Sequence, residues 1–530
     1  MAESTMTNPE KSSADFTPGI DRRLGWPDAL SLLTAFALIL FTSWFRSHGR
    51  IFWSDEILGW LVLRQPTYSQ MLHAWNAGVD SSGIFFYFVA RPWLRVFGAS
   101  AMALRLCSAT ALAAGFAVTW ITARRFYSFG TVLLGIFPFY LLSRGMDWQM
   151  SDARCYGLWI FATAFTAYMF VRTAPGKKIG PGALLLTFLA HALLVGSHML
   201  GILYSGGFVV GLLAQDVVAR KFRPALYLSA MSGWFIVIVS MRNFAIIASN
   251  GRPSFWTLRP AFRDIFFILT AYESFLYTIL GLAAVAFIAA YLARARAGLR
   301  DQFFLSSRYS IYFIVFSLFF TAFAIFIKSK LGISICVDRY LLPVLIGDVF
   351  LLCEFLDRLS AMIFNEKWAL RCGTVALLLF CATWVHGLKD ELPLPEKDFT
   401  QALLERIPQG MPLVILDSGI FSQMALYQNE HARILTLVDW PILLDPNFGP
   451  GGVSGGHEMD NWRKIGFYSS QIQTTTQILT ENPAFIVMTN DLHPLWLQKR
   501  VMSNPLYKVT ALPDFVKNRD TERLWLVRTR

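Results

Sequence analysis

The chain has 530 residues, of which 55% are hydrophobic and 15% are charged, and its mean hydropathy is +0.46. Soluble globular domains are less apolar and more charged, so the recurring long apolar runs indicate a polytopic membrane protein. The net charge of +12 does not predict a nucleic-acid partner, because the Lys and Arg residues cluster in short loops between apolar runs, which is the pattern that sets membrane orientation.

Residues 1–27 are polar and are predicted to form a cytoplasmic tail. They carry no cleavable signal pattern, so we expect the first membrane span, 28–45, to be retained. The cysteines lie in or beside apolar runs, which argues against a disulfide framework and against cysteine metal ligands. They are Cys107, Cys155, Cys336, Cys353, Cys372 and Cys381.

A long stretch, 46–101, follows the first span and is predicted to form an extracytoplasmic loop with interfacial helices. It carries two adjacent carboxylates, Asp55 and Glu56, just past the end of the span. Side chains at this depth can reach both water and a lipid headgroup. The alternative is that the acids only begin an interfacial helix, with Ser54 as its N-cap.

The apolar run Ile84 to Phe97 within this loop could be mistaken for a span. It has only 14 residues and contains Arg91, Pro92 and Arg95, which makes it too short and too charged to cross a bilayer comfortably. We therefore interpret it as a helix that lies on or dips into the membrane interface.

Further apolar runs bring the expected total to about eleven spans. They cover residues 102–123, 131–146, 154–171, 182–197, 199–217, 224–241, 274–293, 309–327, 341–356 and 369–387. With this count, the basic loops all fall on the side of the N-terminal tail, which the positive-inside rule identifies as the cytoplasm. The acidic pair, a polar turn at 147–152 and the loops 242–273 and 328–340 then lie outside.

Residues 390–530 differ in composition and are predicted to form a small extracytoplasmic α/β domain after a transmembrane domain that covers 28–389. Strand-like runs alternate with a helix-like stretch, Gln471 to Leu479, and the glycine-rich segment Pro446 to Gly456 is expected to be a mobile loop, either a plain surface loop or a lid over a substrate. The strand-like runs are Pro412 to Leu416, Arg433 to Val438, Ala484 to Thr489 and Leu524 to Val527.

Several ionisable residues converge on the predicted outer face. They are Asp55, Glu56, Asp152, Arg154, His198, Lys328, Lys330, Asp338, Arg339 and Tyr340. Carboxylates can act as general bases or hold a divalent cation, and Lys or Arg can hold a phosphate. This combination suits the transfer of a group from a lipid-linked phosphate to a hydroxyl. No Walker motif, dinucleotide fingerprint or HExxH site is present.

Each of these residues also has a structural interpretation. Asp152 and Arg154 could simply pair with each other, and His198 could be a satisfied polar residue in a turn. Arg339 and Tyr340 could be the ordinary flank of a membrane helix. The remaining cations, Lys328 and Lys330, could bind lipid headgroups without specificity.

The order of motifs resembles the GT-C glycosyltransferases, specifically the bacterial branch with the protein O-mannosyltransferases, the aminoarabinose lipid A transferase and the RgtA/B/C/D-like enzymes. The resemblance covers 28 to about 345 and continues to the C-terminal domain without a motif there. The residues that carry it are Asp55-Glu56, Gly98-Ala99-Ser100, Ala103-Leu104-Arg105-Leu106, Arg124-Arg125-Phe126, Ser151-Asp152-Ala153-Arg154-Cys155-Tyr156-Gly157-Leu158, Ser197-His198-Met199 and Asp338-Arg339-Tyr340-Leu341-Leu342-Pro343.

The resemblance implies a polyprenyl-phosphate sugar donor, transfer outside the cytoplasmic membrane, Asp55 as the catalytic carboxylate and Asp152 as a second acid. It also brings Tyr156 and His198 forward as site candidates. One departure matters: many relatives carry His-Pro-Pro before the aromatic helix of the first loop, whereas this chain has Asp80-Ser81-Ser82-Gly83. This departure concerns the acceptor side of the site.

The sequence thus predicts a GT-C-like membrane glycosyltransferase, a hexosyl- or pentosyltransferase, in a bacterial inner membrane, with its N-terminus in the cytoplasm. Asp55 is the expected base, assisted by Glu56 or Asp152, and Arg339, Tyr340, Lys328 and Lys330 are the expected donor-phosphate ligands. The acceptor could be a glycan, a lipid or a protein, and a divalent Mg or Mn ion is possible as a cofactor.

The rival is a transporter or flippase of lipid-linked glycans. Such a protein should show an internal repeat and broken spans in matching positions, which this sequence lacks.

Overall fold

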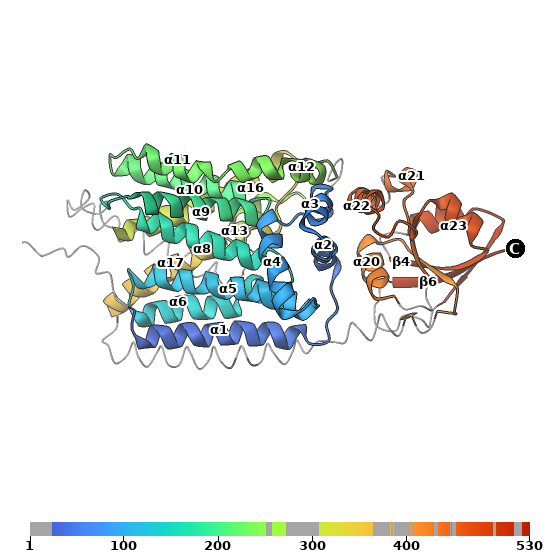
Figure 1. Cartoon of the computed structure of the whole chain (residues 1–530), viewed down its shortest axis with the longest axis horizontal. Helices are drawn as coiled ribbons and strands as arrows, with labels where there is room; N and C mark the ends of the chain where they lie inside the picture. The colour runs from blue at the N-terminus through green and yellow to red at the C-terminus, as the bar shows by residue number, and fades with distance from the viewer. Residues whose placement is uncertain are drawn as a thin grey trace, which may run out of the picture.

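The structure is a computed structural model that describes residues 24–250, 257–271, 307–363, 382, 385, 403–404, 407–428, 433–445, 447, 452–490, 494–512 and 522–530. Long helices run side by side in a bundle, and a smaller part with a β-sheet lies at one end of that bundle (Figure 1). This arrangement confirms the predicted fold class of a helical membrane protein with a C-terminal α/β part.

The bundle helices occupy the predicted spans. They are α1 (Trp26–Ser47), α5 (Ala101–Arg124), α6 (Phe129–Leu142), α8 (Tyr156–Arg172), α9 (Pro181–Ser197), α10 (Gly201–Val218), α11 (Pro224–Ser232), α12 (Phe235–Asn250), α16 (Ser310–Leu331) and α17 (Val344–Ile363). Among the described residues, five helical stretches are long and apolar enough to cross a membrane: Trp26–Ser47, Ala101–Arg124, Gly201–Val218, Pro224–Asn250 and Ser310–Leu331. The predicted span 274–293, and 369–387 apart from 382 and 385, lie outside the described residues, so the count of eleven stays a prediction.

Small residues let the bundle helices approach one another closely. A Cβ added at Gly157 of α8 would lie 2.1 Å from the backbone oxygen of Ser108 on α5. At Gly211 of α10 it would lie 1.9 Å from Oγ of Ser317 on α16. Helices in a membrane associate through this kind of tight packing, because lipid provides little hydrophobic drive between them.

The first loop folds into three short helices, α2 (Ser54–Leu63), α3 (Tyr68–Asn76) and α4 (Ile84–Phe97). The helix expected over 84–97 is thus confirmed within its predicted bounds, and it packs against α5 and α9 at the end of the bundle (Figure 1). Two expected loops contain helices instead. Most of the turn at 147–152 belongs to α7 (Arg144–Met150), and the 242–273 loop begins inside α12 and later includes η1 (Phe262–Asp264) and α13 (Ile265–Ile268).

The C-terminal part contains a six-stranded sheet in the order β3-β2-β1-β4-β6-β5. Its strands are β1 (Pro412–Ile415), β2 (Arg433–Leu437), β3 (Ile472–Gln473), β4 (Ala484–Asn490), β5 (Tyr507–Ala511) and β6 (Glu522–Thr529). Neighbours among β3, β2, β1 and β4 pair in parallel, whereas β6 pairs antiparallel with β4 and β5. The four strand-like runs seen in the sequence are therefore confirmed as β1, β2, β4 and β6.

Two expectations for this domain were wrong in part. The helix expected over Gln471 to Leu479 starts late, since β3 comes first and α23 (Thr475–Glu481) follows it. The glycine-rich loop also ends early, because α22 (Gly452–Lys464) begins at Gly452. The rest of that loop, apart from Asn447, lies outside the described residues.

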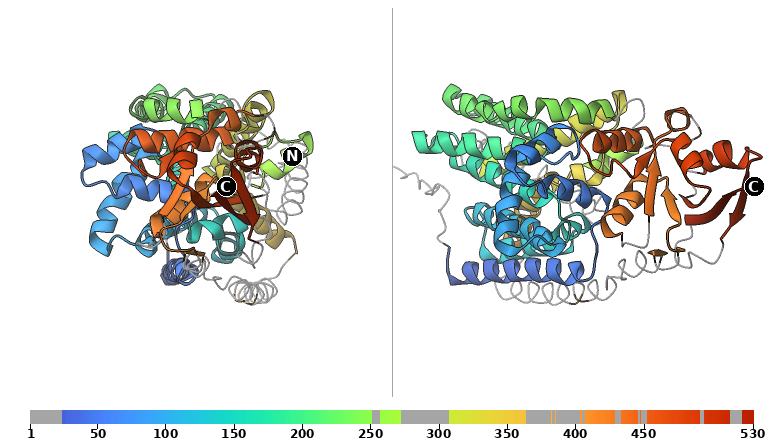
Figure 2. Two further views of the ribbon diagram at one scale, coloured as in Figure 1. Left: turned by 90° about the vertical axis from the view of Figure 1, so that its right-hand side faces the viewer. Right: turned by 45° about the vertical axis from the view of Figure 1, so that its right-hand side comes forward.

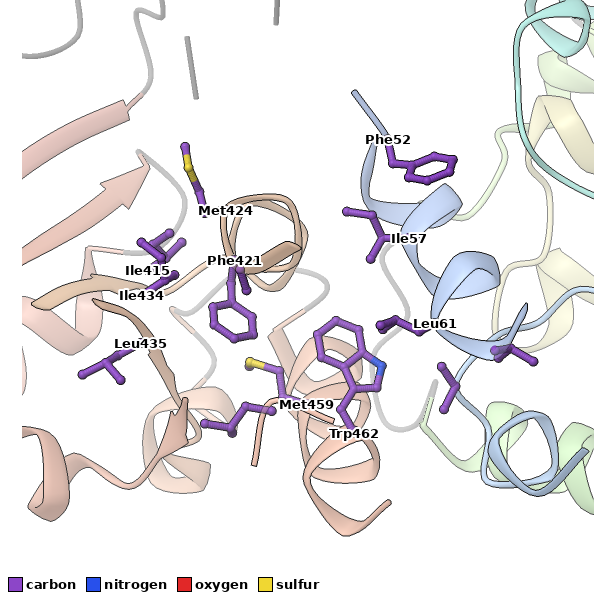
Figure 3. Packing of buried hydrophobic residues seen from close by; sticks show 14 of the residues in the cluster. Phe52, Ile57, Leu61, Ile415, Phe421, Met424, Ile434, Leu435, Met459 and Trp462 are labelled. Carbon is purple, nitrogen blue, oxygen red and sulfur yellow. The ribbon is translucent and has the colours of Figure 1, made fainter. Parts of the chain in front are cut away.

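The C-terminal part packs on the helix that carries the acidic pair. Phe421 of α20 (Ser418–Tyr427) and Met459 and Trp462 of α22 face Ile57 and Leu61 of α2 (Figure 3). The backbone N–H of Phe52 donates to the Tyr427 hydroxyl at 3.0 Å. The right-hand view of Figure 2 also places the sheet beyond the end of the bundle that carries α2 and α3. The loop that holds Asp55 is thus covered by the last part of the chain.

The predicted topology can be tested by labelling with an impermeant thiol reagent in intact cells. Lys464→Cys on α22 and Lys178→Cys between α8 and α9 both present exposed positions. We expect Lys464→Cys to be labelled before lysis and Lys178→Cys only after lysis, because the basic loops should be cytoplasmic. The parent protein controls for its own cysteines. Protection of Lys464→Cys in intact cells would show that the span count is wrong.

Candidate active site

The acidic pair stands in the first turn of α2. The helix begins at Ser54 and its N-cap is Trp53, so the expected cap at Ser54 is wrong by one residue. Glu56 takes the capping role, because its Oε2 accepts the backbone N–H of Trp53 at 3.1 Å. Acids in the first turn also suit the positive end of the helix dipole.

Glu56 is held on all sides. Its carboxylate forms a two-pronged ion pair with Arg105 of α5, at 2.8 Å to Nε and 2.5 Å to Nη2, and both side chains are fully buried. It also accepts the backbone N–H of Ala153 at 2.7 Å. The remaining donors of Arg105 reach the backbone oxygens of residues 50 and 51. Glu56 therefore ties the first loop to α5 and to the start of α8, which is a structural task.

Asp152 lies next to this pair and is buried. One carboxylate oxygen accepts the indole N–H of Trp53 at 3.0 Å. Burial raises the pKa of Asp152 from its usual value of 3.8 to about 7, and the neighbouring Glu56 carboxylate adds to the rise. A carboxyl group that titrates near neutral pH can accept or donate a proton, as an acid–base catalyst must.

Arg154 does not pair with Asp152, which was one interpretation of the sequence. Its Nη1 instead lies 2.8 Å from Asp80 Oδ1, and it also donates to the backbone oxygen of Asp55. Tyr87 of α4 donates its hydroxyl to the other oxygen of Asp80. Asp80 thus connects the loop before α4 to the start of α8 and to the acidic pair.

Asp55 pairs with Arg339. Nη1 of Arg339 lies 2.9 Å from Asp55 Oδ2, and the two side chains keep 23% and 24% of their surface exposed. The guanidinium also lies 5.8 Å from the ring centres of Trp53 and Tyr340. Of the paired carboxylates in this cluster, Asp55 is the one that solvent or a ligand can reach, whereas Glu56 and Asp80 are buried.

A group of aromatic rings lies next to Arg339 and includes Tyr340 and His198. His198 stacks on Trp159 at 4.0 Å and lies 5.3 Å from the Tyr340 ring and 5.5 Å from Tyr156. Its Nδ1 accepts the backbone N–H of Leu200 at 3.1 Å. Burial, together with the positive charges of Arg154 and Arg339, lowers the pKa of His198 well below its usual range. His198 is therefore a neutral packing partner of Tyr340 in this arrangement.

The other cations expected at the site have partners of their own. Lys328 is exposed and donates to the backbone oxygen of Ile333 at 2.6 Å, and Lys330 lies 4.5 Å from the Phe262 ring centre. Asp338 accepts the backbone N–H of Arg339 at 2.7 Å. These residues flank the cluster, and their role in donor binding stays a prediction.

Several members of this cluster were absent from the predicted set of site residues. Asp80 and Tyr87 connect to Arg154, Trp53 reaches Asp152, and Glu458 on α22 interacts electrostatically with Asp55 and Asp80. The sequence marked Asp80 only as part of the segment that departs from the His-Pro-Pro of many relatives, because a single acid in a polar loop does not by itself indicate a site residue. Within the described parts of the chain, no group of three or more His, Cys, Asp or Glu residues is placed to hold a metal ion.

Comparison with solved structures identifies this fold. Crystal structures of ArnT from Cupriavidus metallidurans, one bound to undecaprenyl phosphate and one in the apo state, match with TM-scores of 0.53 and 0.57. Their sequences are 12% and 13% identical to this chain, and each match covers 94% of this chain and 98% of ArnT. No protein-family model and no curated protein matches the sequence. The fold expected from the GT-C resemblance is therefore confirmed.

Removing one partner of the Glu56–Arg105 pair should destabilise the protein strongly. Glu56→Ala leaves the buried Arg105 guanidinium without its counter-charge, which typically costs roughly 3–5 kcal/mol. We expect a large fall in the thermal unfolding temperature in detergent. Glu481→Ala, an acid on α23 remote from this pair, serves as the control. Equal unfolding temperatures for the two variants would contradict the structural role of Glu56.

The raised pKa of Asp152 predicts a pH-dependent stability. The unfolded carboxyl loses its proton near pH 3.8, whereas the folded one keeps it up to about pH 7. Stability from this group is therefore complete below the first value and is lost as pH rises to the second. The side chain introduced by Asp152→Asn cannot ionise. As pH rises over this range, the unfolding temperature of the variant should therefore increase relative to that of the wild type. The exposed Asp338→Asn should track the wild type; parallel curves for wild type and Asp152→Asn would refute the assignment.

Proposed function

We propose that this protein is a membrane glycosyltransferase that moves a sugar from a polyprenyl-phosphate donor to an acceptor hydroxyl. The observation that carries the proposal is the partly exposed Asp55–Arg339 pair, a carboxylate and a guanidinium 2.9 Å apart at the end of the helical bundle. The fold supports it, because ArnT has the same fold and was crystallised with undecaprenyl phosphate.

The pair suggests how donor binding prepares the base. Arg339 neutralises the charge of Asp55 through their ion pair. A phosphate group offers Arg339 a bidentate partner of higher charge, so its arrival would draw the guanidinium away and free the carboxylate. The Tyr340 ring lies 5.8 Å from the guanidinium of Arg339 and is tilted against the His198 ring, so both rings border the space next to Arg339.

The proposed reaction forms one bond to the anomeric carbon, breaks another, and transfers one proton. The acceptor oxygen attacks the anomeric carbon of the donor, and the bond from that carbon to the phosphate oxygen breaks. Asp55 takes the proton of the acceptor hydroxyl, and polyprenyl phosphate leaves with its negative charge held by Arg339. Asp152 can then receive the proton from the site, since its pKa is raised to about 7.

The proposed place of this reaction is the outer surface of a bacterial cytoplasmic membrane. The polar cluster lies at the end of the bundle that carries the C-terminal part, whereas basic Arg124 and Arg125 close the other end of α5 (Figure 1). Both hexosyl and pentosyl donors are compatible with this mechanism, because it involves only the anomeric carbon and the phosphate.

Two variants separate the two roles. Asp55→Asn keeps the side-chain shape but removes the base, so sugar transfer should fall by roughly 10²- to 10⁴-fold while undecaprenyl phosphate still binds. Arg339→Ala should instead weaken binding of undecaprenyl phosphate. The measurements are a tryptophan-fluorescence titration with undecaprenyl phosphate and the recovery of one sugar mass on envelope glycans when each variant is returned to cells that lack the gene.

Matched controls come from the same predicted side of the membrane. Asp264→Asn and Arg263→Ala change a carboxylate and an exposed guanidinium in the 257–271 segment, and both should behave as the wild type. Full glycan recovery by a stably folded Asp55→Asn protein would rule out Asp55 as the base. An unaltered undecaprenyl phosphate titration for Arg339→Ala would remove Arg339 from the donor site.

A further inference from the structure

The C-terminal part turns one face of α22 toward the acidic cluster. Gly455, Glu458 and Asn461 are three residues apart and so lie on one side of the helix. A Cβ added at Gly455 would lie 3.0 Å from Oγ of Ser418, and one added at Gly78 would lie 3.6 Å from Nδ2 of Asn461. Glu458 therefore lies between the start of α20 and the loop that leads to Asp80.

The start of α20 in turn lies on α2. A Cβ added at Gly419 would come within 3.2 Å of Cβ of Ser54, the residue before Asp55. Gln423 of α20 donates to the backbone oxygen of Phe52 at 3.2 Å. These contacts fix α20 and α22 over the first turn of α2, so Glu458 faces Asp55 across the junction between the two parts of the chain.

The charges around Glu458 are mostly negative. The carboxylates of Asp55, Asp80 and Asp417 and the guanidinium of Arg154 act electrostatically on Glu458, and Arg154 already pairs with Asp80. Burial and the nearby carboxylates raise the pKa of Glu458 to about 8. At neutral pH its carboxyl group is therefore protonated and can both donate and accept a hydrogen bond, as a sugar or alcohol hydroxyl requires.

The same charges disfavour a second phosphate at this position. Among the described side chains here, Arg105 pairs with the buried Glu56 and Arg154 with the buried Asp80, whereas Arg339 pairs with the partly exposed Asp55 and is the cation proposed to hold the donor phosphate. An anionic group placed next to Glu458 would meet the carboxylates of Asp55, Asp80 and Asp417, and like charges this close repel.

We propose that the acceptor binds in the junction between α2 and α22, that Glu458 hydrogen-bonds its hydroxyl-bearing part opposite Asp55, and that this part is uncharged. The inference rests on the proposed glycosyltransferase function and assigns its acceptor class: a neutral carbohydrate or alcohol group, in contrast to a phosphate. The C-terminal part is then one wall of the acceptor site.

The test measures transfer against acceptor concentration with purified full-length variants. The acceptor is the envelope extract of cells that lack the gene, and the donor is the polyprenyl-phosphate sugar fraction of those cells. Glu458→Ala should raise the half-saturating acceptor concentration roughly tenfold through the loss of a hydrogen bond, with little change at saturation. Glu458→Gln keeps a donor and an acceptor and should stay within about threefold of the wild type.

Asp460→Asn is the matched control, because Asp460 lies on the same helix but binds Trp440 and Arg463 on another face. All variants should titrate with undecaprenyl phosphate as the wild type does. A normal half-saturation for Glu458→Ala overturns the proposal, as does an equal loss for Glu458→Gln, which would mean that a charge acts there. Weaker undecaprenyl phosphate binding by Glu458→Ala would place Glu458 on the donor side.

A separate experiment tests whether the acceptor needs a phosphate group. Phosphatase treatment of the extract should leave transfer by the wild type unchanged, whereas loss of acceptor capacity would show that a phosphate group is required. If the wild type transfers no sugar to either extract, the glycosyltransferase function itself fails. That outcome is distinct from a working enzyme that is indifferent to Glu458.

Discussion

The buried ion pair between Glu56 and Arg105 is the interaction on which the rest of this architecture depends. It satisfies both charges inside a region that excludes water, where an unpartnered charge would be very costly. Because Glu56 also accepts the N–H groups of Trp53 and Ala153, one carboxylate fixes the start of α2, the middle of the site and the start of α8 together. Because these contacts fix Glu56, they also fix the backbone position of the adjacent Asp55.

Two adjacent acids therefore have opposite environments. Glu56 points into the protein and is fully enclosed, whereas Asp55 points to the junction and keeps about a quarter of its side chain exposed, with Arg339 as an exchangeable partner. A helix turns by about 100° per residue, so consecutive side chains must face different surroundings. Within one helical turn, Glu56 therefore fixes the backbone, and Asp55 presents a carboxylate that a ligand can reach.

The sequence predicted the bundle helices and four strands because apolar periodicity depends on local composition. It missed α7, whose seven residues mix polar and apolar side chains, and β3, whose two residues become a strand only by pairing with β2. It named Asp55, Asp152 and Arg339, but the partners of these residues depend on contacts between distant segments. Arg154 meets Asp80 across 74 positions, and no local pattern encodes such a pairing.

The contact between Phe52 and Tyr427 has a consequence for biogenesis. The two residues are 375 positions apart, so at synthesis rates of about 5–20 residues/s the acidic loop waits roughly 20–75 s for its cover. During that time Ile57 and Leu61 of α2 lack the residues of α20 and α22 that face them in the folded protein (Figure 3). A segment that is translated late thus covers a helix that is made early, and a chain that stalls before Tyr427 would leave Ile57 and Leu61 without these apolar neighbours and open to recognition by chaperones and proteases.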